Sequence, residues 1–275
     1  MAGGVSRYRI GCTGWGYDEW REAGFYPPGA AAGEFLERYA RVFPLAEVDA
    51  TYYAAPSREQ VARWAAATPA GFTFTVKLPG SITHQAALRG AEDAFEAFLR
   101  ALDPLQAAGK LGPLLVQLPA NFTRWKDEAA LREFFALVPA PYRVAVELRH
   151  HGWWRPETYR LLEAHGASLV WSVNQYADTP PVVTADFLYA RFIGDRALTR
   201  FDGIQRDKTE EMRRWRDRFE TEGAAAREVF VLLNNHYMGY APATAVRMQE
   251  VLGLPPADLT AAARDRAQRA LGDYL

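Results

Sequence analysis

Short runs of apolar and β-branched residues alternate with longer amphipathic segments along most of the chain. The short runs predict eight strands, over residues 8–13, 46–49, 72–78, 113–118, 143–149, 168–172, 187–193 and 229–234. The longer segments predict helices over residues 33–42, 58–67, 91–107, 127–137, 156–165, 208–222 and 242–252. Such alternation is typical of strand–helix units arranged around a parallel sheet.

The number of predicted strands favours a closed barrel. Eight strands in a chain of 275 residues fit a (β/α)8, TIM-barrel-like fold better than an open, doubly wound sheet. The segment Gly11-Cys12-Thr13-Gly14-Trp15-Gly16, which begins at the end of the first predicted strand, matches neither the GxGxxG fingerprint nor a P-loop. Because no repeat or linker divides the chain, we expect a single domain over residues 1–275.

Two segments depart from the regular alternation. Residues 174–186 contain Pro180-Pro181 and show little helical periodicity, so we expect an irregular sixth crossover. Near the end of the chain, apolar residues recur at helical spacing at Leu259, Ala263, Ala267 and Leu271. This spacing predicts an extra C-terminal helix.

Composition and charge narrow the class of protein. With 49% hydrophobic and 24% charged residues, the chain resembles an ordinary soluble globular protein. No apolar run approaches the roughly 20 residues that span a membrane, and no secretory signal is visible, so we expect a cytoplasmic protein without membrane association. The 32 Lys+Arg and 33 Asp+Glu argue against nucleic-acid binding through overall positive charge.

Strand parity places charged side chains inside the predicted barrel. In the third strand, Phe74, Val76 and Leu78 share one face, which must meet the helices, so Lys77 points inward. The same reasoning applied to the other strands directs further polar residues into the barrel, near the strand ends where this fold places its sites: Gln117, Glu147, Arg149 and Arg191.

Burial of so many charges costs several kcal/mol per ion unless they pair, meet water or bind a ligand. Three cations, Lys77, Arg149 and Arg191, face Glu147, or Glu147 and Asp49. This count predicts surplus positive potential, which a phosphate or carboxylate group of a substrate would complete. The alternative is a structural ion network that fills the barrel.

Other candidate residues follow the same strand ends. His84 is a candidate proton carrier, and Asn234 and Asn235 offer amide donors and acceptors. Three aromatic residues could contact a sugar ring or nucleobase, or equally form a hydrophobic lid: Trp15, Tyr53 and Trp153. The histidines and carboxylates show no metal-binding spacing such as HExxH, so no metal site is predicted and no cofactor is identified.

Several motifs carry a family resemblance. They include Ile10-Gly11-Cys12-Thr13-Gly14-Trp15, Glu47-Val48-Asp49-Ala50-Thr51-Tyr52-Tyr53, Gln117-Leu118-Pro119, Glu147-Leu148-Arg149-His150, Tyr189-Ala190-Arg191 and Asn234-Asn235-His236. In this order they resemble the DUF72, or YecE-like, family. The resemblance implies a TIM barrel and supplies no reaction, because the family's function is undefined. Asp49-Ala50 and Phe192-Ile193-Gly194 depart from the family's usual residues.

Two functional hypotheses follow. The first is a hydrolase of phosphoester or glycosidic bonds that binds a small anionic substrate, with Glu147 as base or nucleophile and His84 and Lys77 in support. Glycosidic cleavage would need Asp49 as a second carboxylate opposite Glu147. The second is a noncatalytic binding module for a nucleic-acid end or a phosphorylated metabolite. The first hypothesis predicts that E147Q abolishes turnover and leaves the fold intact.

Overall fold

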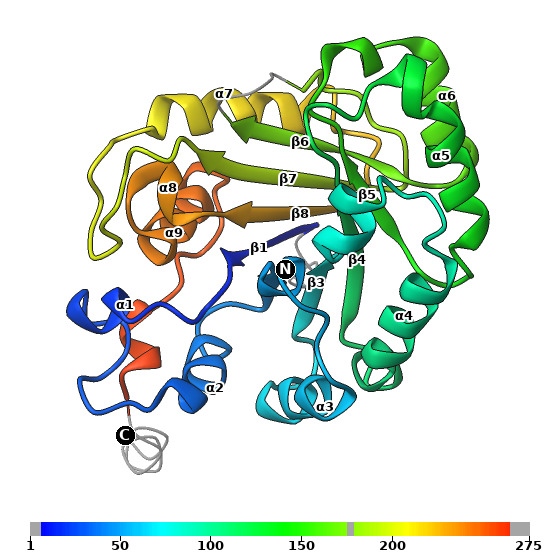
Figure 1. Ribbon diagram of the computed structural model, residues 1–275. Coiled ribbons are helices and arrows are strands. Elements are labelled where there is room, and N and C mark those ends of the chain that lie inside the picture. Colours follow the sequence, from blue (N-terminus) through cyan, green and yellow to red (C-terminus); the bar gives the residue numbers. More distant parts are fainter. Residues whose placement is uncertain (1–6, 175–178, 265–275) are drawn as a thin grey trace.

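The computed structural model describes residues 7–174 and 179–264, and its eight parallel strands close into a barrel (Figure 1). The strands are β1 (Tyr8–Thr13), β2 (Leu45–Val48), β3 (Thr73–Lys77), β4 (Leu111–Gln117), β5 (Val144–Glu147), β6 (Ser168–Asn174), β7 (Phe187–Gly194) and β8 (Glu228–Leu233). Each strand pairs with the next, and β8 pairs with β1. All eight predicted strands are confirmed, with limits that shift by at most two residues.

The predicted helices surround the barrel. They are α2 (Phe35–Tyr39), α3 (Arg58–Ala67), α4 (Glu92–Ala107), α5 (Arg124–Leu137), α6 (Pro156–Ala164), α7 (Thr209–Glu220) and α9 (Ala241–Val251). Ser57 caps α3, because its Oγ accepts a hydrogen bond from the Gln60 backbone N–H at 3.1 Å. The first predicted helix is divided, since the 3-10 turn η1 (Ala32–Glu34) precedes α2.

Short helical turns follow several strands and are missing from the sequence-based prediction. They are α1 (Glu19–Glu22), η2 (Ala50–Tyr52), the π-helical turn η3 (Ser81–Gln85), η4 (His151–Trp153) and α8 (Asn235–Met238). Each has five residues or fewer, too short for a helical period to show in the sequence. These turns lie beyond the C-terminal strand ends, so they shape the mouth of the barrel.

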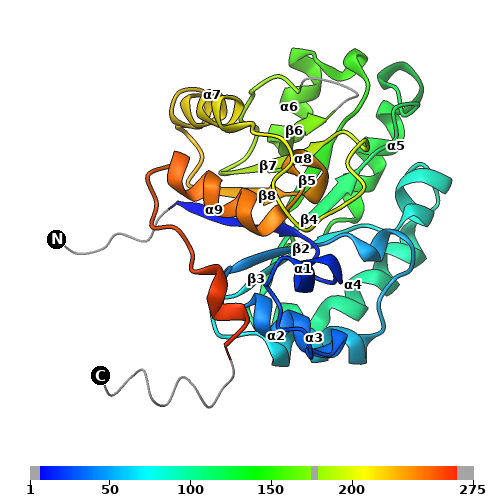
Figure 2. The ribbon, with the colours of Figure 1, turned by 90° about the vertical axis from the view of Figure 1, so that its left-hand side faces the viewer.

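The two irregular segments have different outcomes. The crossover between β6 and β7 contains no helix over the described residues 179–186, as predicted. Near the C-terminus, Leu259–Ala262 forms a 3-10 turn (η5) rather than an α-helix, and this turn lies beside α2 (Figure 2). Arg38 of α2 donates a hydrogen bond to the Ala262 carbonyl at 3.3 Å. The rest of the predicted C-terminal helix, from Ala267 to Leu271, lies outside the described residues.

An apolar layer fills the inside of the barrel below the strand ends. It consists of Leu45, Leu115, Ala145, Val170, Phe187, Tyr189, Phe230 and Leu232. Two residues further along five of these strands, on the same face, a polar side chain follows: Glu47, Gln117, Glu147, Ser172 and Arg191. The barrel therefore carries a polar layer above an apolar floor.

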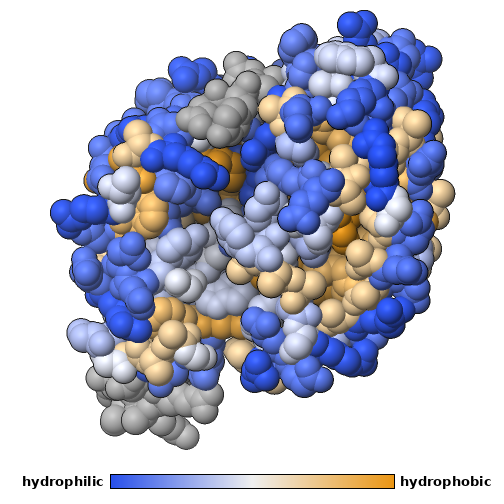
Figure 3. Space-filling model, viewed as in Figure 1, coloured by the Kyte–Doolittle hydropathy of each residue, from blue (hydrophilic) through white to orange (hydrophobic). Residues whose placement is uncertain are grey.

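One face of the molecule is largely polar. Hydrophilic residues cover most of the face seen in Figure 3, with smaller hydrophobic areas between them. Within residues 7–174 and 179–264, we find no helix with the length and apolar character required to cross a membrane.

Candidate functional site

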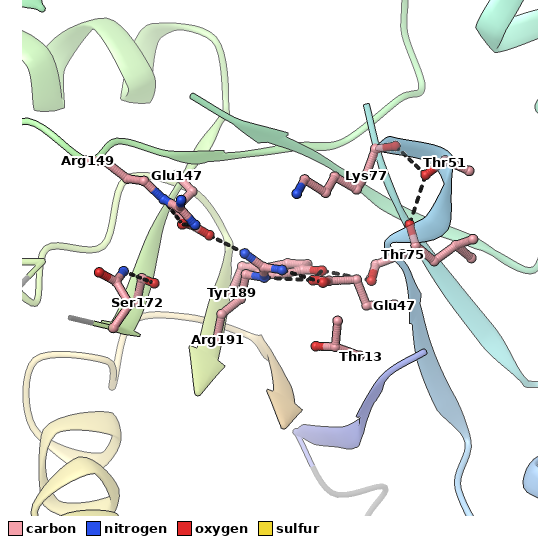
Figure 4. Close-up of polar contacts among 12 residues, drawn as sticks. Thr13, Glu47, Thr51, Thr75, Lys77, Glu147, Arg149, Ser172, Tyr189 and Arg191 are labelled. Atoms are coloured by element: carbon pink, nitrogen blue, oxygen red, sulfur yellow. Dashed lines mark hydrogen bonds and ion pairs between the residues drawn. The ribbon is translucent and has the colours of Figure 1, made fainter. Parts of the chain in front are cut away.

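A buried arginine links two glutamates across the barrel (Figure 4). Arg191 of β7 donates to Glu47 of β2 through Nε, at 2.9 Å, and through Nη2, at 2.5 Å. Its Nη1 donates to Glu147 of β5. Both carboxylates are fully buried and Arg191 is 3% exposed. Burial disfavours the charged guanidinium, but the two glutamates outweigh burial and hold the pKa of Arg191 above its ordinary value.

A second arginine completes the environment of Glu147. Arg149 lies just beyond β5, and its Nε donates to Glu147 Oε1 at 2.7 Å. Burial raises the pKa of Glu147, but attraction and hydrogen bonds from Arg191 and Arg149 outweigh it and lower the pKa to about 2. A carboxylate that is enclosed in this way is a very weak base. This enclosure argues against Glu147 as base or nucleophile, and that role stays a prediction.

Glu47 changes the predicted charge count. The sequence places Glu47 on the same strand face as Asp49, yet the count omitted it. In the structure Glu47 pairs with Arg191, so Lys77, Arg149 and Arg191 face two buried glutamates together with Asp49. The surplus is one positive charge when Asp49 is protonated and none when it is ionised. This surplus is smaller than predicted.

A cavity of about 570 Å³ opens above the ion network, at the C-terminal strand ends. Eight of the predicted site residues line it: Asp49, Tyr53, Lys77, Gln117, Arg149, Arg191, Asn234 and Asn235. Residues that the prediction did not select also line it, among them Tyr17, Tyr52, Arg196, Phe201 and His236. The inward polar layer and the turns after the strands thus meet in one space.

Lys77 ends β3 and points toward the centre of the barrel (Figure 4). Its ammonium lies 4.3 Å from the centre of the Tyr52 ring, and it forms no hydrogen bond or ion pair with any other described residue. Thr51 Oγ1 holds the backbone here by donating to the Lys77 carbonyl at 2.6 Å. Burial and the nearby Arg191 charge lower the pKa of Lys77 to about 8.

Two further titratable groups lie close to Lys77. Burial and the negative charge of Glu47 raise the pKa of Asp49, against the opposing pull of Arg191 and Lys77. His84 of η3 contacts Tyr52 at 4.9 Å between ring centres, and its Nε2 lies 3.4 Å from Gln117 Nε2. Burial and the charges of Lys77 and Arg149 lower the pKa of His84. The imidazole is therefore mainly neutral at pH 7.

The two asparagines after β8 have different roles. Asn234 Oδ1 accepts a hydrogen bond from the His236 backbone N–H at 3.0 Å and so caps α8. Asn235 Oδ1 accepts from Trp20 Nε1 at 3.2 Å and from the Ala241 backbone N–H at 2.8 Å. These two donors fix the amide, and its buried Nδ2 has no acceptor among the described residues. Asn235 therefore fixes Trp20 and the start of α9, and within residues 7–174 and 179–264 its Nδ2 is an unpaired buried donor.

The three predicted aromatic contacts are divided among three environments. Tyr53 is 87% exposed and stands on the cavity wall. Trp15 lines a neighbouring pocket with Trp64, at 5.9 Å between ring centres, and is not part of the main cavity wall. Trp153 is fully buried, and its Nε1 donates to the Phe122 carbonyl at 2.9 Å. The prediction that Trp153 contacts substrate is wrong.

Metal binding has little support in the described part of the chain. Residues 7–174 and 179–264 contain no group of three or more His, Cys, Asp and Glu side chains placed to hold a metal ion. The cavity wall itself offers Lys77, arginines, the Asp49 carboxyl with its raised pKa, and amides, while the His84 imidazole lies behind Tyr52 and is not part of the wall.

The fold and the cavity define a (β/α)8 barrel protein with a polar site at the C-terminal end of its strands. The family model "Protein of unknown function DUF72" matches residues 9–269. The chain belongs to the DUF72 family. This confirms the resemblance seen in the sequence.

Named relatives and solved structures agree with this assignment. UPF0759 protein YecE of Escherichia coli K12 is 37% identical over 141 residues, which is 51% of this chain and 48% of YecE, so the chain spans about half the length of that relative. UPF0759 protein YunF of Bacillus subtilis 168 is 27% identical over 91% of this chain and 98% of its own length.

Two crystal structures of DUF72 family proteins are similar to this fold. The Enterococcus faecalis V583 protein has a TM-score of 0.75 and 26% identity, covering 92% of this chain and 98% of its own. The Thermotoga maritima MSB8 protein has a TM-score of 0.73 and 29% identity, and the match covers 90% of this chain and 99% of its own. These names identify the family, and none of them states a reaction.

Proposed function

We propose that the protein is an enzyme that binds a small substrate through a phosphate or carboxylate group in the cavity at the C-terminal strand ends. The observation that supports this most is the Lys77 ammonium, which projects into the cavity without a hydrogen-bond or ion-pair partner among the described residues. Partial burial of an unneutralised charge is unfavourable, and an anionic ligand group would compensate it.

The surrounding groups suit such a ligand. Arg149 lines the same cavity as Lys77, and although its Nε and Nη2 contact Glu147, its side chain is 18% exposed. Asn235 also lines this cavity. Arg191 contributes its positive field rather than direct contacts, because Nε, Nη1 and Nη2 already bind the two glutamates. We assign the anionic group to Lys77 and Arg149.

We assign proton transfer to Asp49 and His84 rather than to Glu147. Asp49 has a raised pKa and Lys77 a lowered one, and such opposed displacements in one cavity are typical of acid–base sites. The neutral His84 imidazole lies beside them and suits a proton carrier. Asp49 replaces Glu147 as our candidate acid or base.

Of the two hydrolytic reactions, phosphoester hydrolysis retains support. It depends mainly on positioning and electrostatic stabilisation, which Lys77 and Arg149 can provide. Glycosidic cleavage by the Asp49 and Glu147 pair loses support, because two arginines enclose the Glu147 carboxylate and none of its surface is exposed.

The test compares phosphate binding in the wild type, K77M and a control. Lys126 is exposed on α5 and does not line the cavity, so K126M is the matched control. Calorimetric titration with inorganic phosphate should show affinity that K77M weakens by roughly tenfold or more, since a charged hydrogen bond contributes about 1.5–3 kcal/mol. K126M should bind as the wild type does. Equal affinity in all three proteins would remove the proposed anion site.

The noncatalytic alternative rests on one observation, the 87% exposed Tyr53 on the cavity wall, which could stack on a base at a nucleic-acid end. Turnover of phosphomonoesters that D49N abolishes would favour the enzyme. Binding of a 5′-phosphorylated oligonucleotide that falls steeply with salt, without chemical change on long incubation, would favour the binding module.

A further inference from the structure

Lysine is rare in this chain, and its four copies have different surroundings. They are Lys77, Lys110, Lys126 and Lys208, among 32 Lys+Arg residues. Lys110 Nζ donates to the carbonyls of Ala65 and Thr68, both at 2.6 Å. Lys208 pairs with Glu211 at 3.2 Å. Lys77 is the member of the four that faces the main cavity.

An anion alone does not explain a lysine at this position. Arginine binds phosphate and carboxylate at least as well, through two parallel donors, and it stays protonated. A lysine differs because its amine can lose a proton and become a nucleophile. The Tyr52 ring beside Lys77 Nζ provides an apolar wall and accepts no strong hydrogen bond through its face, so the nitrogen lone pair is not blocked there.

We propose that Lys77 Nζ attacks the carbonyl carbon of a small aldehyde or ketone that carries a phosphate or carboxylate group, and forms an imine with it. The proposal rests on the anion site proposed above, because Arg149 would hold the anionic group while Lys77 reacts. It goes beyond that site by naming the substrate class, an anionic carbonyl compound, and a covalent step.

The step balances with the groups at hand. The Nζ lone pair forms the C–N bond, and the carbonyl π electrons move to oxygen, which takes a proton from the Asp49 carboxyl. The Asp49 carboxylate then accepts a proton from the nitrogen. Asp49 next protonates the hydroxyl, the C–O bond breaks and water leaves, while the nitrogen lone pair forms the C=N bond. Amine, carbonyl compound and carboxylic acid thus give protonated imine, water and carboxylate.

The electrostatic surroundings of Lys77 favour the reactive amine. The charged and titratable groups that act on it are Arg191 of β7, Glu147 of β5, Glu47 of β2, Asp49 and His84. Their combined effect with burial is a pKa of about 8, against 10.5 for ordinary lysine. At pH 7 this raises the neutral fraction about 300-fold, to roughly a tenth of the molecules.

The experiment traps the imine by reduction. The full-length protein is incubated at pH 7 with sodium cyanoborohydride and one of three probes: pyruvate, dihydroxyacetone phosphate or acetone. Intact-mass measurement and peptide mapping then report the modified lysine. We expect pyruvate or dihydroxyacetone phosphate to modify Lys77 at least about tenfold more than the exposed Lys126, and acetone to modify it far less. The more reactive of the two anionic probes identifies carboxylate or phosphate as the partner of Arg149.

Variants separate this proposal from the anion site. K77R keeps the positive charge and should lose the trapped adduct while it retains phosphate binding, whereas K126R should behave as the wild type. Phosphate binding that needs Lys77, together with equal modification of Lys77 and Lys126, would overturn the imine and leave the anion site standing. Acetone labelling as strong as that by the anionic probes would overturn the assigned substrate class. The wild-type peptide map decides the outcome even where K77R does not fold.

Discussion

Replacement of Glu147 by Gln tests the buried ion network, which is the structural base of the site. In the wild type, the carboxylate accepts hydrogen bonds from both Arg149 and Arg191, and it is fully buried. A glutamine of the same shape carries no charge, and its Nε2 would face an arginine donor. E147Q therefore removes one of the two counter-ions of the buried Arg191 and the glutamate partner of Arg149, and it places two donors against each other.

Two estimates of the loss in the free energy of unfolding caused by E147Q agree. Removal of one partner of a buried ion pair destabilises a protein by about 3–5 kcal/mol. Independently, a glutamate pKa held at about 2 rather than near 4.5 corresponds to about 3 kcal/mol of stability. This contribution is complete above pH 4.5 and is lost as the pH falls toward 2, since protonation then becomes equal in the folded and unfolded chains. We expect the free energy of unfolding of E147Q to be about 3 kcal/mol lower than that of the wild type at pH 7.

Urea unfolding at pH 7, followed by circular dichroism, measures this loss. The matched control is E96Q, because Glu96 forms its ion pair with Arg100 on the surface and is 68% exposed. Exposed pairs contribute little, so E96Q should stay within about 0.5 kcal/mol of the wild type. An E147Q protein as stable as E96Q would refute the reasoning. It would instead restore the sequence-based expectation that this substitution leaves the fold intact.

Three further predictions concern the site and its surroundings. W153A should cost about 3–5 kcal/mol in urea unfolding, because the side chain is fully buried, and should leave phosphate affinity unchanged. Y53A should alter stability by less than about 0.5 kcal/mol, since Tyr53 is 87% exposed. Because the pKa of Lys77 is lowered in the folded protein, the unfolded chain binds more protons than the folded chain between pH 8 and 10.5. The free energy of unfolding of the wild type should therefore rise by about 2 kcal/mol relative to that of K77M between pH 7 and 9.5.

The sequence was sufficient for the architecture. Strand alternation located all eight strands, and the apolar face of β3 at Phe74 and Val76 correctly directed Lys77 inward. This succeeded because the two faces of a strand in a barrel meet different environments, so burial imposes a period of two that a single sequence retains. The one-turn helices after the strands left no such period, and the prediction missed them.

Details of the site depended on contacts between distant segments. Glu47 lies 144 residues from Arg191, and nothing in the local pattern of β2 showed that the two would pair. Trp153 follows β5 and was expected at the rim, but the turn η4 folds it onto Phe122, in a stacked arrangement at 5.6 Å. Strand parity fixes the direction of a side chain, whereas pairing and loop burial depend on the whole fold.

The most direct test of the central claim is a crystal structure of the protein soaked with inorganic phosphate in a sulfate-free buffer. The account predicts an anion within hydrogen-bond distance of Lys77 Nζ and the Arg149 guanidinium, above an intact Glu47, Arg191 and Glu147 network. A cavity without an anion, in which Lys77 forms an ion pair with Asp49, would contradict it.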